Sequence, residues 1–135
     1  MIAADVTIRV QFYDLDPMQV VWHGNYARFL EQARCALLER IGYTYEDMAA
    51  SGFAWPVVDM RIKYVRPARL QQEIVVEAIL VEHAHRLKID YRIRDRDSGE
   101  VLTKATTVQV AVRIDNGELQ LESPAILLEK VQRLQ

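Results

Sequence analysis

With 135 residues, half of them hydrophobic, the chain is long enough for one ordinary globular domain, and no linker or low-complexity run divides it. Acidic and basic residues are mixed along the sequence and the formal net charge is -2, which argues against nucleic-acid binding. No segment is long enough to span a bilayer, and the start Met-Ile-Ala-Ala-Asp lacks a signal-peptide pattern. We therefore expect a single domain over residues 1–135, located in the cytoplasm.

The chain opens with a predicted strand, a polar loop and a long amphipathic helix. Hydrophobic and polar residues alternate from Val6 to Tyr13, as expected of a half-buried strand. After the loop, Asn25 is a good N-cap and Gly42 a good left-handed stop, so a helix is predicted between them. The apolar positions of this helix are Tyr26, Phe29, Leu30, Ala33, Leu37 and Ile41.

The rest of the chain reads mostly as strands. Thr44 and Asp47 form a capping pattern that predicts a short helix to about Ala50. Period-two alternation then predicts strands at 58–64, 74–80, 87–93 and 101–114, with tight turns at 97–99 and 115–117. Ser123 and Pro124 resemble the N-cap and first residue of a terminal helix.

One helical pattern among antiparallel strands predicts an α+β fold in which the long helix packs on the sheet. One helix cannot cover five strands on both faces. An apolar face and at least one sheet edge remain, and pairing with a second copy of the chain is the simplest way to cover them.

The most chemically distinctive segment precedes the long helix. Two carboxylates, Asp14 and Asp16, are followed by His23 and Gly24 at the predicted helix start. The first backbone N–H groups of a helix lack intrahelical partners and carry partial positive charge, so they can bind a polarised carbonyl oxygen. A nearby carboxylate could then act as base or nucleophile towards that carbonyl carbon, and the sequence leaves both roles open.

The chain resembles the hotdog-fold acyl-CoA thioesterases of the 4-hydroxybenzoyl-CoA thioesterase type. The resemblance rests on the Asp-x-Asp-Pro and His-x-Asn-Tyr motifs, and on the segments 25–34 and 63–70. It implies a hotdog fold, in which an antiparallel sheet of about five strands wraps on one long central helix. It further implies that Asp16 is the catalytic carboxylate, that the backbone at His23 and Gly24 helps to bind the thioester oxygen, and that homodimers or homotetramers form. Many relatives carry glycine where this chain has Met18 or Gln19.

Other assignments compete for these residues. Asp14 and Asp16 could be ordinary turn residues, and we interpret Asp14 as structural. Glu31, on the long helix, is the second choice of catalytic carboxylate, although a solvated or ion-paired role suits its position between Arg28 and Arg34. Cys35 is expected to be buried rather than reactive. The histidines and the single cysteine make no metal-ligand set, and no serine-hydrolase or phosphate-loop motif occurs, so we expect neither a metal nor a cofactor.

The leading hypothesis is therefore an acyl-CoA thioesterase that releases a free acid and coenzyme A, which is part of the substrate. Among the basic residues, Arg66 and Arg86 are our candidates for binding the coenzyme A phosphates. A non-catalytic acyl-CoA-binding hotdog module is the alternative. A hotdog hydratase fits less well, because the loop aspartate and histidine follow the thioesterase order and spacing.

Overall fold

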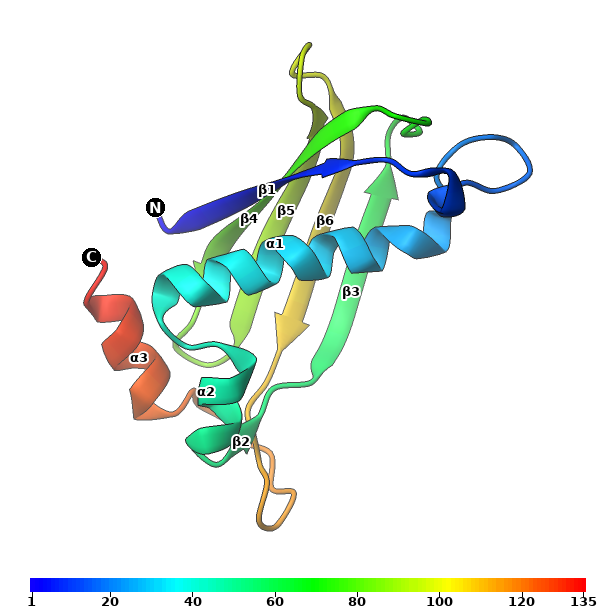
Figure 1. Ribbon diagram of the computed structural model, residues 1–135. Coiled ribbons are helices and arrows are strands. Elements are labelled where there is room, and N and C mark those ends of the chain that lie inside the picture. The colour runs from blue at the N-terminus through cyan, green and yellow to red at the C-terminus, as the bar shows by residue number, and fades with distance from the viewer.

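The fold is built on a five-stranded antiparallel sheet (Figure 1). The computed structural model describes all residues, 1–135. The strands run in the spatial order β1-β4-β5-β6-β3. Their bounds are β1 Ala3–Arg9, β3 Val57–Tyr64, β4 Glu73–Glu82, β5 Leu87–Asp95 and β6 Val101–Gln109. The strands β1 and β3 are therefore the two edges of the sheet.

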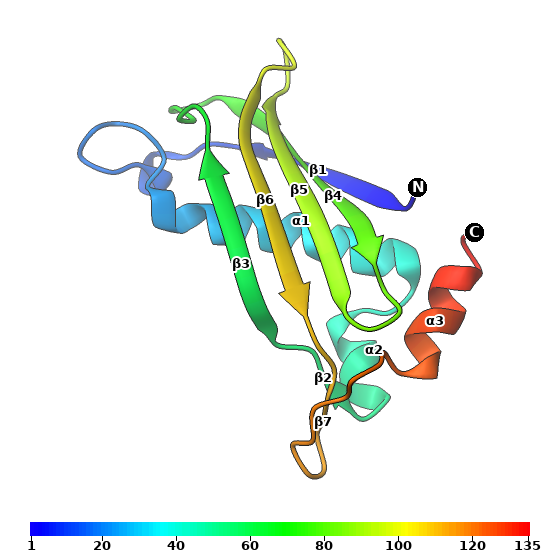
Figure 2. The same ribbon diagram turned by 180° about the vertical axis from the view of Figure 1, so that it is seen from behind.

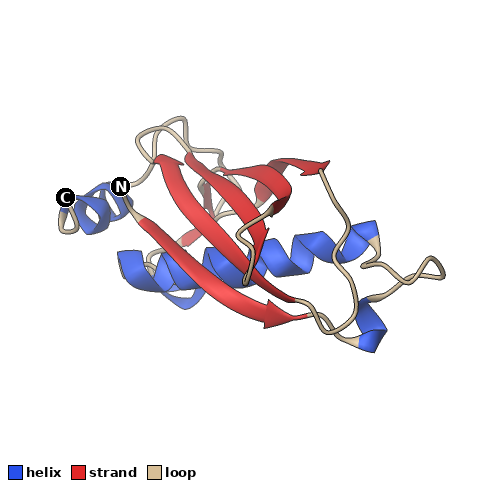
Figure 3. Cartoon of the chain, turned by 90° about the horizontal axis from the view of Figure 1, so that it is seen from above, coloured by secondary structure: helices blue, strands red, loops and turns tan.

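The long helix α1 (Tyr26–Ile41) lies across one face of this sheet (Figures 1 and 3). Its buried apolar stripe packs chiefly against β1 and β4. Gly42 ends the helix in the left-handed region, at φ 84°, as the sequence predicts. These elements confirm the predicted α+β class, with the core between α1 and the inner face of the sheet.

Shorter elements gather at one end of the sheet (Figure 1). They are α2 (Tyr45–Ala50), β2 (Phe53–Ala54), β7 (Val112–Arg113) and the terminal helix α3 (Ala125–Gln132). The strands β2 and β7 pair with one another in a separate small ladder. No helix is long and apolar enough to cross a membrane.

Two strand predictions have wrong boundaries. The first strand ends at Arg9 instead of Tyr13. The chain turns there into a short 3-10 turn, η1 (Phe12–Asp14), because the carboxylate of Asp14 accepts a hydrogen bond from the backbone N–H of Gln11. The predicted strand 101–114 is split in two after Gln109, because β7 leaves the main sheet to pair with β2. Alternation alone does not reveal such a change of partner strand.

Of the three predicted helix caps, only one uses its side chain. Thr44 and Asp47 form the predicted capping box of α2. Asn25 sits at the N-cap position, but its side chain donates to the carbonyl oxygen of Asp14 instead of capping α1. The Ser123 hydroxyl is buried without a hydrogen-bond partner, and Pro124 takes the N-cap position of α3.

The core contains a buried arginine that no carboxylate neutralises. Arg34 is 8% exposed, and its guanidinium donates to the hydroxyl of Tyr45 at 2.7 Å and to that of Tyr91 at 3.4 Å. The Tyr91 hydroxyl also shares a 2.7 Å hydrogen bond with Thr107 on β6. Hydroxyl oxygens thus satisfy a charge that would otherwise be costly to bury.

The sheet leaves two surfaces without a covering element. The edge strand β3 pairs only with β6, and it exposes Val57, Val58, Met60 and Tyr64. The outer face of the sheet, opposite α1, carries no helix (Figure 2). Since an open strand edge offers unpaired backbone groups, the β3 edge is available to a second chain.

Candidate active site

Asp16 lies at the base of a tight loop that joins η1 to the start of α1. Isolated bridges pair Leu15 with Val21 and Val20 with Arg69, so both sides of this loop are held in place. The Asp16 carboxylate accepts a 2.8 Å hydrogen bond from the backbone N–H of Met18. Its other oxygen makes no hydrogen bond within the chain, so this oxygen is free to accept a hydrogen bond from a ligand.

The loop makes a left-handed turn without a glycine. Gln19 has a φ of 63°, a conformation that favours glycine. Its N–H donates to the carbonyl oxygen of Asp16 at 2.9 Å. The loop therefore closes although neither Met18 nor Gln19 is a glycine.

Free backbone donors lie at the start of the long helix. A 3-10 turn, η2 (His23–Asn25), precedes α1, and neither His23 nor Gly24 donates its N–H within the chain. The ring of Trp22 covers Gly24, since a Cβ built at this position would lie 2.5 Å from the indole. A larger residue here would have to displace the half-exposed Trp22 ring, whereas glycine lets the ring lie against the backbone. The two N–H groups remain available to an acceptor from outside.

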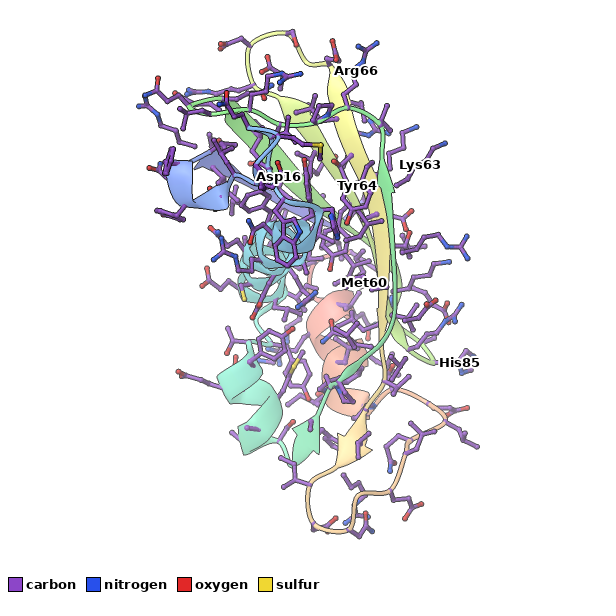
Figure 4. All side chains as sticks on the ribbon, turned by 90° about the vertical axis from the view of Figure 1, so that its right-hand side faces the viewer. Asp16, Met60, Lys63, Tyr64, Arg66 and His85 are labelled. Atoms are coloured by element: carbon purple, nitrogen blue, oxygen red, sulfur yellow. The ribbon has the colours of Figure 1, made fainter.

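A cavity of about 210 Å³ connects the loop with the end of β3. Asp16, His23, Tyr64 and Arg66 line it, together with Met18, Val20, Val21, Tyr26, Val65 and Pro67. The Tyr64 hydroxyl donates a 2.8 Å hydrogen bond to the carbonyl oxygen of His23. Figure 4 shows Asp16 and Tyr64 on the helix side of β3.

Asp14 belongs to the scaffold of the loop. It is buried, and its carboxylate accepts hydrogen bonds from the backbone of Gln11 and from Arg28 at 2.9 Å. Its carbonyl oxygen accepts from Asn25 and from the backbone of Trp22. The structural interpretation of Asp14 is thus confirmed.

The rival carboxylate lies in a different groove. Glu31 lines a cavity of about 650 Å³ between α1 and β1, which Asp16 does not line. It has no ion pair, because Arg28 binds Asp14 and Arg34 binds the two tyrosines. Cys35 lines the same groove and is half-buried. Burial raises the pKa of its thiol, and the negative charge of Glu31 raises this pKa further, so the reactive thiolate is disfavoured.

The two predicted phosphate-binding residues lie apart. Arg66 lines the Asp16 cavity and forms a 3.0 Å ion pair with Glu100. Arg86 lies in the β4–β5 turn, beside His85, and forms a 3.0 Å ion pair with Glu82. Figure 4 shows His85 far from Asp16. One chain therefore brings Asp16, His23 and Arg66 together at this cavity but not Arg86, and Gly24 follows His23 in the chain without lining the cavity.

Tyr64 was not among the candidate site residues predicted from the sequence, although it lines the cavity. It falls in the segment 63–70 that carries part of the family resemblance, but the alternation of β3 indicated only a buried core position. Tyr64 is in fact half exposed at the cavity, because α1 does not cover the β3 edge.

Comparison with known proteins gives the family. The family model described as the thioesterase-like superfamily matches residues 10–131. A Bacillus subtilis (strain 168) protein named "Putative acyl-CoA thioesterase YneP" is 32% identical over 106 residues, which cover 78% of this chain and 76% of the relative. The chain belongs to the thioesterase-like superfamily, as its motifs predict.

Two further relatives extend this result. The chain is 29% identical over 127 residues to an acyl-acyl carrier protein thioesterase (ATL3, chloroplastic) of Arabidopsis thaliana, covering 93% of this chain and 66% of the relative. The crystal structure of a DHNA-CoA thioesterase from Staphylococcus aureus matches with a TM-score of 0.84 and 25% identity, covering 99% of this chain and 93% of that one. The predicted hotdog fold is thereby confirmed, and the chain is a thioester hydrolase by family.

Proposed function

We propose that this protein hydrolyses acyl-CoA thioesters to a free acid and coenzyme A, with Asp16 as the catalytic carboxylate. One observation carries the proposal: the carboxylate of Asp16, which has a free oxygen, lines the same cavity as His23. His23 is the first residue of the turn that leads into α1, and its backbone N–H has no partner within the chain. Family membership independently supports thioester chemistry.

The thioester carbonyl oxygen would accept hydrogen bonds from the N–H groups of His23 and Gly24. These donors, strengthened by the dipole of α1, would stabilise the negative charge that develops on this oxygen in the transition state. Asp16 would either remove a proton from the attacking water or attack the carbonyl carbon itself. In the second case water hydrolyses the resulting anhydride; in both cases the thiolate of coenzyme A leaves.

Arg66 is the proposed contact for the coenzyme A phosphates, since it lies on the wall of the same cavity. Arg86 is proposed as a second phosphate contact, although within one chain it lies on the turn far from this cavity. No metal or cofactor has a role in this reaction as we propose it.

We further propose that the active protein is a homodimer or a dimer of dimers. The open β3 edge, with its exposed Met60 and Tyr64, supports this assembly, because two-fold pairing of β3 strands would bury both side chains. Tyr64 would then lie at the subunit boundary, beside the cavity that holds Asp16.

A thiol-release screen tests the proposal. The purified protein is assayed with short-chain, long-chain and aromatic acyl-CoAs, and turnover of at least one class is expected. Acyl-CoA binding without turnover of any class would instead support the non-catalytic binding module.

A further inference from the structure

The outer face of the sheet carries a row of three like charges. Cross-strand register places Lys63 of β3 directly opposite Lys104 of β6, and Lys104 directly opposite Arg92 of β5. Neighbouring strands lie only about 4.8 Å apart, and like charges placed opposite one another destabilise a sheet. This row costs stability and therefore calls for an explanation.

The cations are not neutralised by neighbouring carboxylates. Arg61, two residues before Lys63 on β3, lies beside this row and opposite Thr106. None of these four side chains forms an ion pair. Asp90 lies among them but accepts a 2.9 Å hydrogen bond from Thr106. Glu77 is opposite Arg92 on β4, yet the two make no ion pair.

These side chains surround a shallow groove of about 280 Å³. Arg61, Lys63, Arg92 and Lys104 line it, with Asp90 as the single acidic residue. The face is free of helices (Figure 2), so the groove is accessible in the single chain. Four cations around a space of this size suit a compact group with several negative charges, such as a cluster of phosphates.

The groove and the cavity of Asp16 lie on opposite faces of β3, near the same end of this strand. Tyr64 lines the cavity and its neighbour Lys63 lines the groove on the opposite face (Figure 4). Arg66 follows at the cavity wall, and its backbone N–H is bonded to Leu102, two residues before Lys104. An extended ligand with its thioester at Asp16 could therefore pass Arg66 and reach the groove.

We infer that the groove lined by Lys63, Arg92, Lys104 and Arg61 binds the phosphate groups of coenzyme A. The inference rests on the proposed function, since it assigns the phosphate end of the same substrate. It also explains the like-charge row: the bound phosphates supply the negative charge that the chain itself lacks.

The binding test uses the double variant Lys63→Gln/Lys104→Gln and two probes, coenzyme A and adenosine 3′,5′-bisphosphate. Calorimetry should show that the Kd of each probe rises by roughly tenfold or more, as expected for lost contacts to charged groups. Lys88→Gln is the matched control, on the same face of β5 but four residues from Arg92, and its Kd should equal that of the parent. Unchanged probe binding by the folded double variant would overturn the inference.

A kinetic test separates this inference from the proposed function. For the double variant, KM for acyl-CoA should rise about tenfold with kcat nearly unchanged, while hydrolysis of the acyl-pantetheine thioester, which lacks the nucleotide, should be unaffected. An equal loss on both substrates, or a loss only on acyl carrier protein thioesters, would contradict a phosphate site for coenzyme A. Failure of the parent protein to hydrolyse any thioester would instead refute the proposed function. The binding test would still show whether the groove binds the phosphates of coenzyme A.

Discussion

The hydroxyl of Tyr64 donates a 2.8 Å hydrogen bond to the carbonyl oxygen of His23, and so ties the end of β3 to the turn that begins α1. The Tyr64 ring also packs edge-on against Tyr26, with 5.1 Å between centroids. Both contacts fix the orientation of the turn whose N–H groups we propose as donors to the thioester oxygen.

Tyr64→Phe removes only this hydroxyl. We expect kcat to fall by up to about tenfold, because the net contribution of one hydrogen bond is on the order of 1 kcal/mol, with a comparably small change in thermal stability. Tyr13→Phe is the control, since Tyr13 is exposed and its hydroxyl makes no hydrogen bond. Parent activity in Tyr64→Phe would show that the turn does not depend on this contact.

Met60→Lys tests the assembly. Met60 is 47% exposed at the β3 edge, where a partner would cover it, so a lysine should shift the protein to a monomer and abolish most of its activity. Size-exclusion chromatography with light scattering gives the mass. Val81→Lys, at a similarly exposed position of β4 (49%), should leave the mass unchanged. A fully active monomer would rule out an active site that needs the subunit boundary.

The helix caps give a paired stability prediction. Thr44→Ala removes a capping hydroxyl that accepts from Asp47, and should cost about 1 kcal/mol of unfolding free energy. Ser123→Ala removes a hydroxyl that is buried without a partner, and should be neutral or slightly stabilising. Urea unfolding measures both. An equal loss in the two variants would mean that Ser123 caps α3 after all.

The buried tyrosine on β5 predicts a loss of stability at alkaline pH. Burial raises the pKa of Tyr91 above its ordinary value of 10.0, although Arg34 opposes this. Above pH 10 the unfolded chain therefore loses this proton before the folded chain does, so stability falls as pH rises through the folded pKa. Unfolding free energies between pH 8 and 11 should fall less steeply in Tyr91→Phe than in the parent. Identical slopes would show that Tyr91 does not contribute to the pH dependence of the unfolding free energy.

Local patterns predicted most of the fold. Strict alternation located β3, β4 and β5, and the helical stripe with Gly42 located α1. These predictions succeed because each depends on one face of one element. The split after Gln109 and the alternative partner of Asn25 could not be predicted, since both depend on strands and loops distant in the sequence.

The site was predictable only in part, for the same reason. The family motifs indicated Asp16, His23 and Gly24, which lie within one short segment of the sequence. The roles proposed for Tyr64 and for the row of Lys63, Lys104 and Arg92 depend on register across three strands. No single segment of the sequence contains that information.

Asp16→Asn tests the central claim most directly. The amide keeps the size of the side chain and its bond from Met18, but it can serve neither as base nor as nucleophile. We expect acyl-CoA hydrolysis to fall by roughly 10²-fold or more with substrate binding largely retained, whereas Glu31→Gln, in the groove on the β1 side, should cost much less. Parent-rate hydrolysis by Asp16→Asn, together with an inactive but folded Glu31→Gln, would contradict the account and assign catalysis to the helix glutamate.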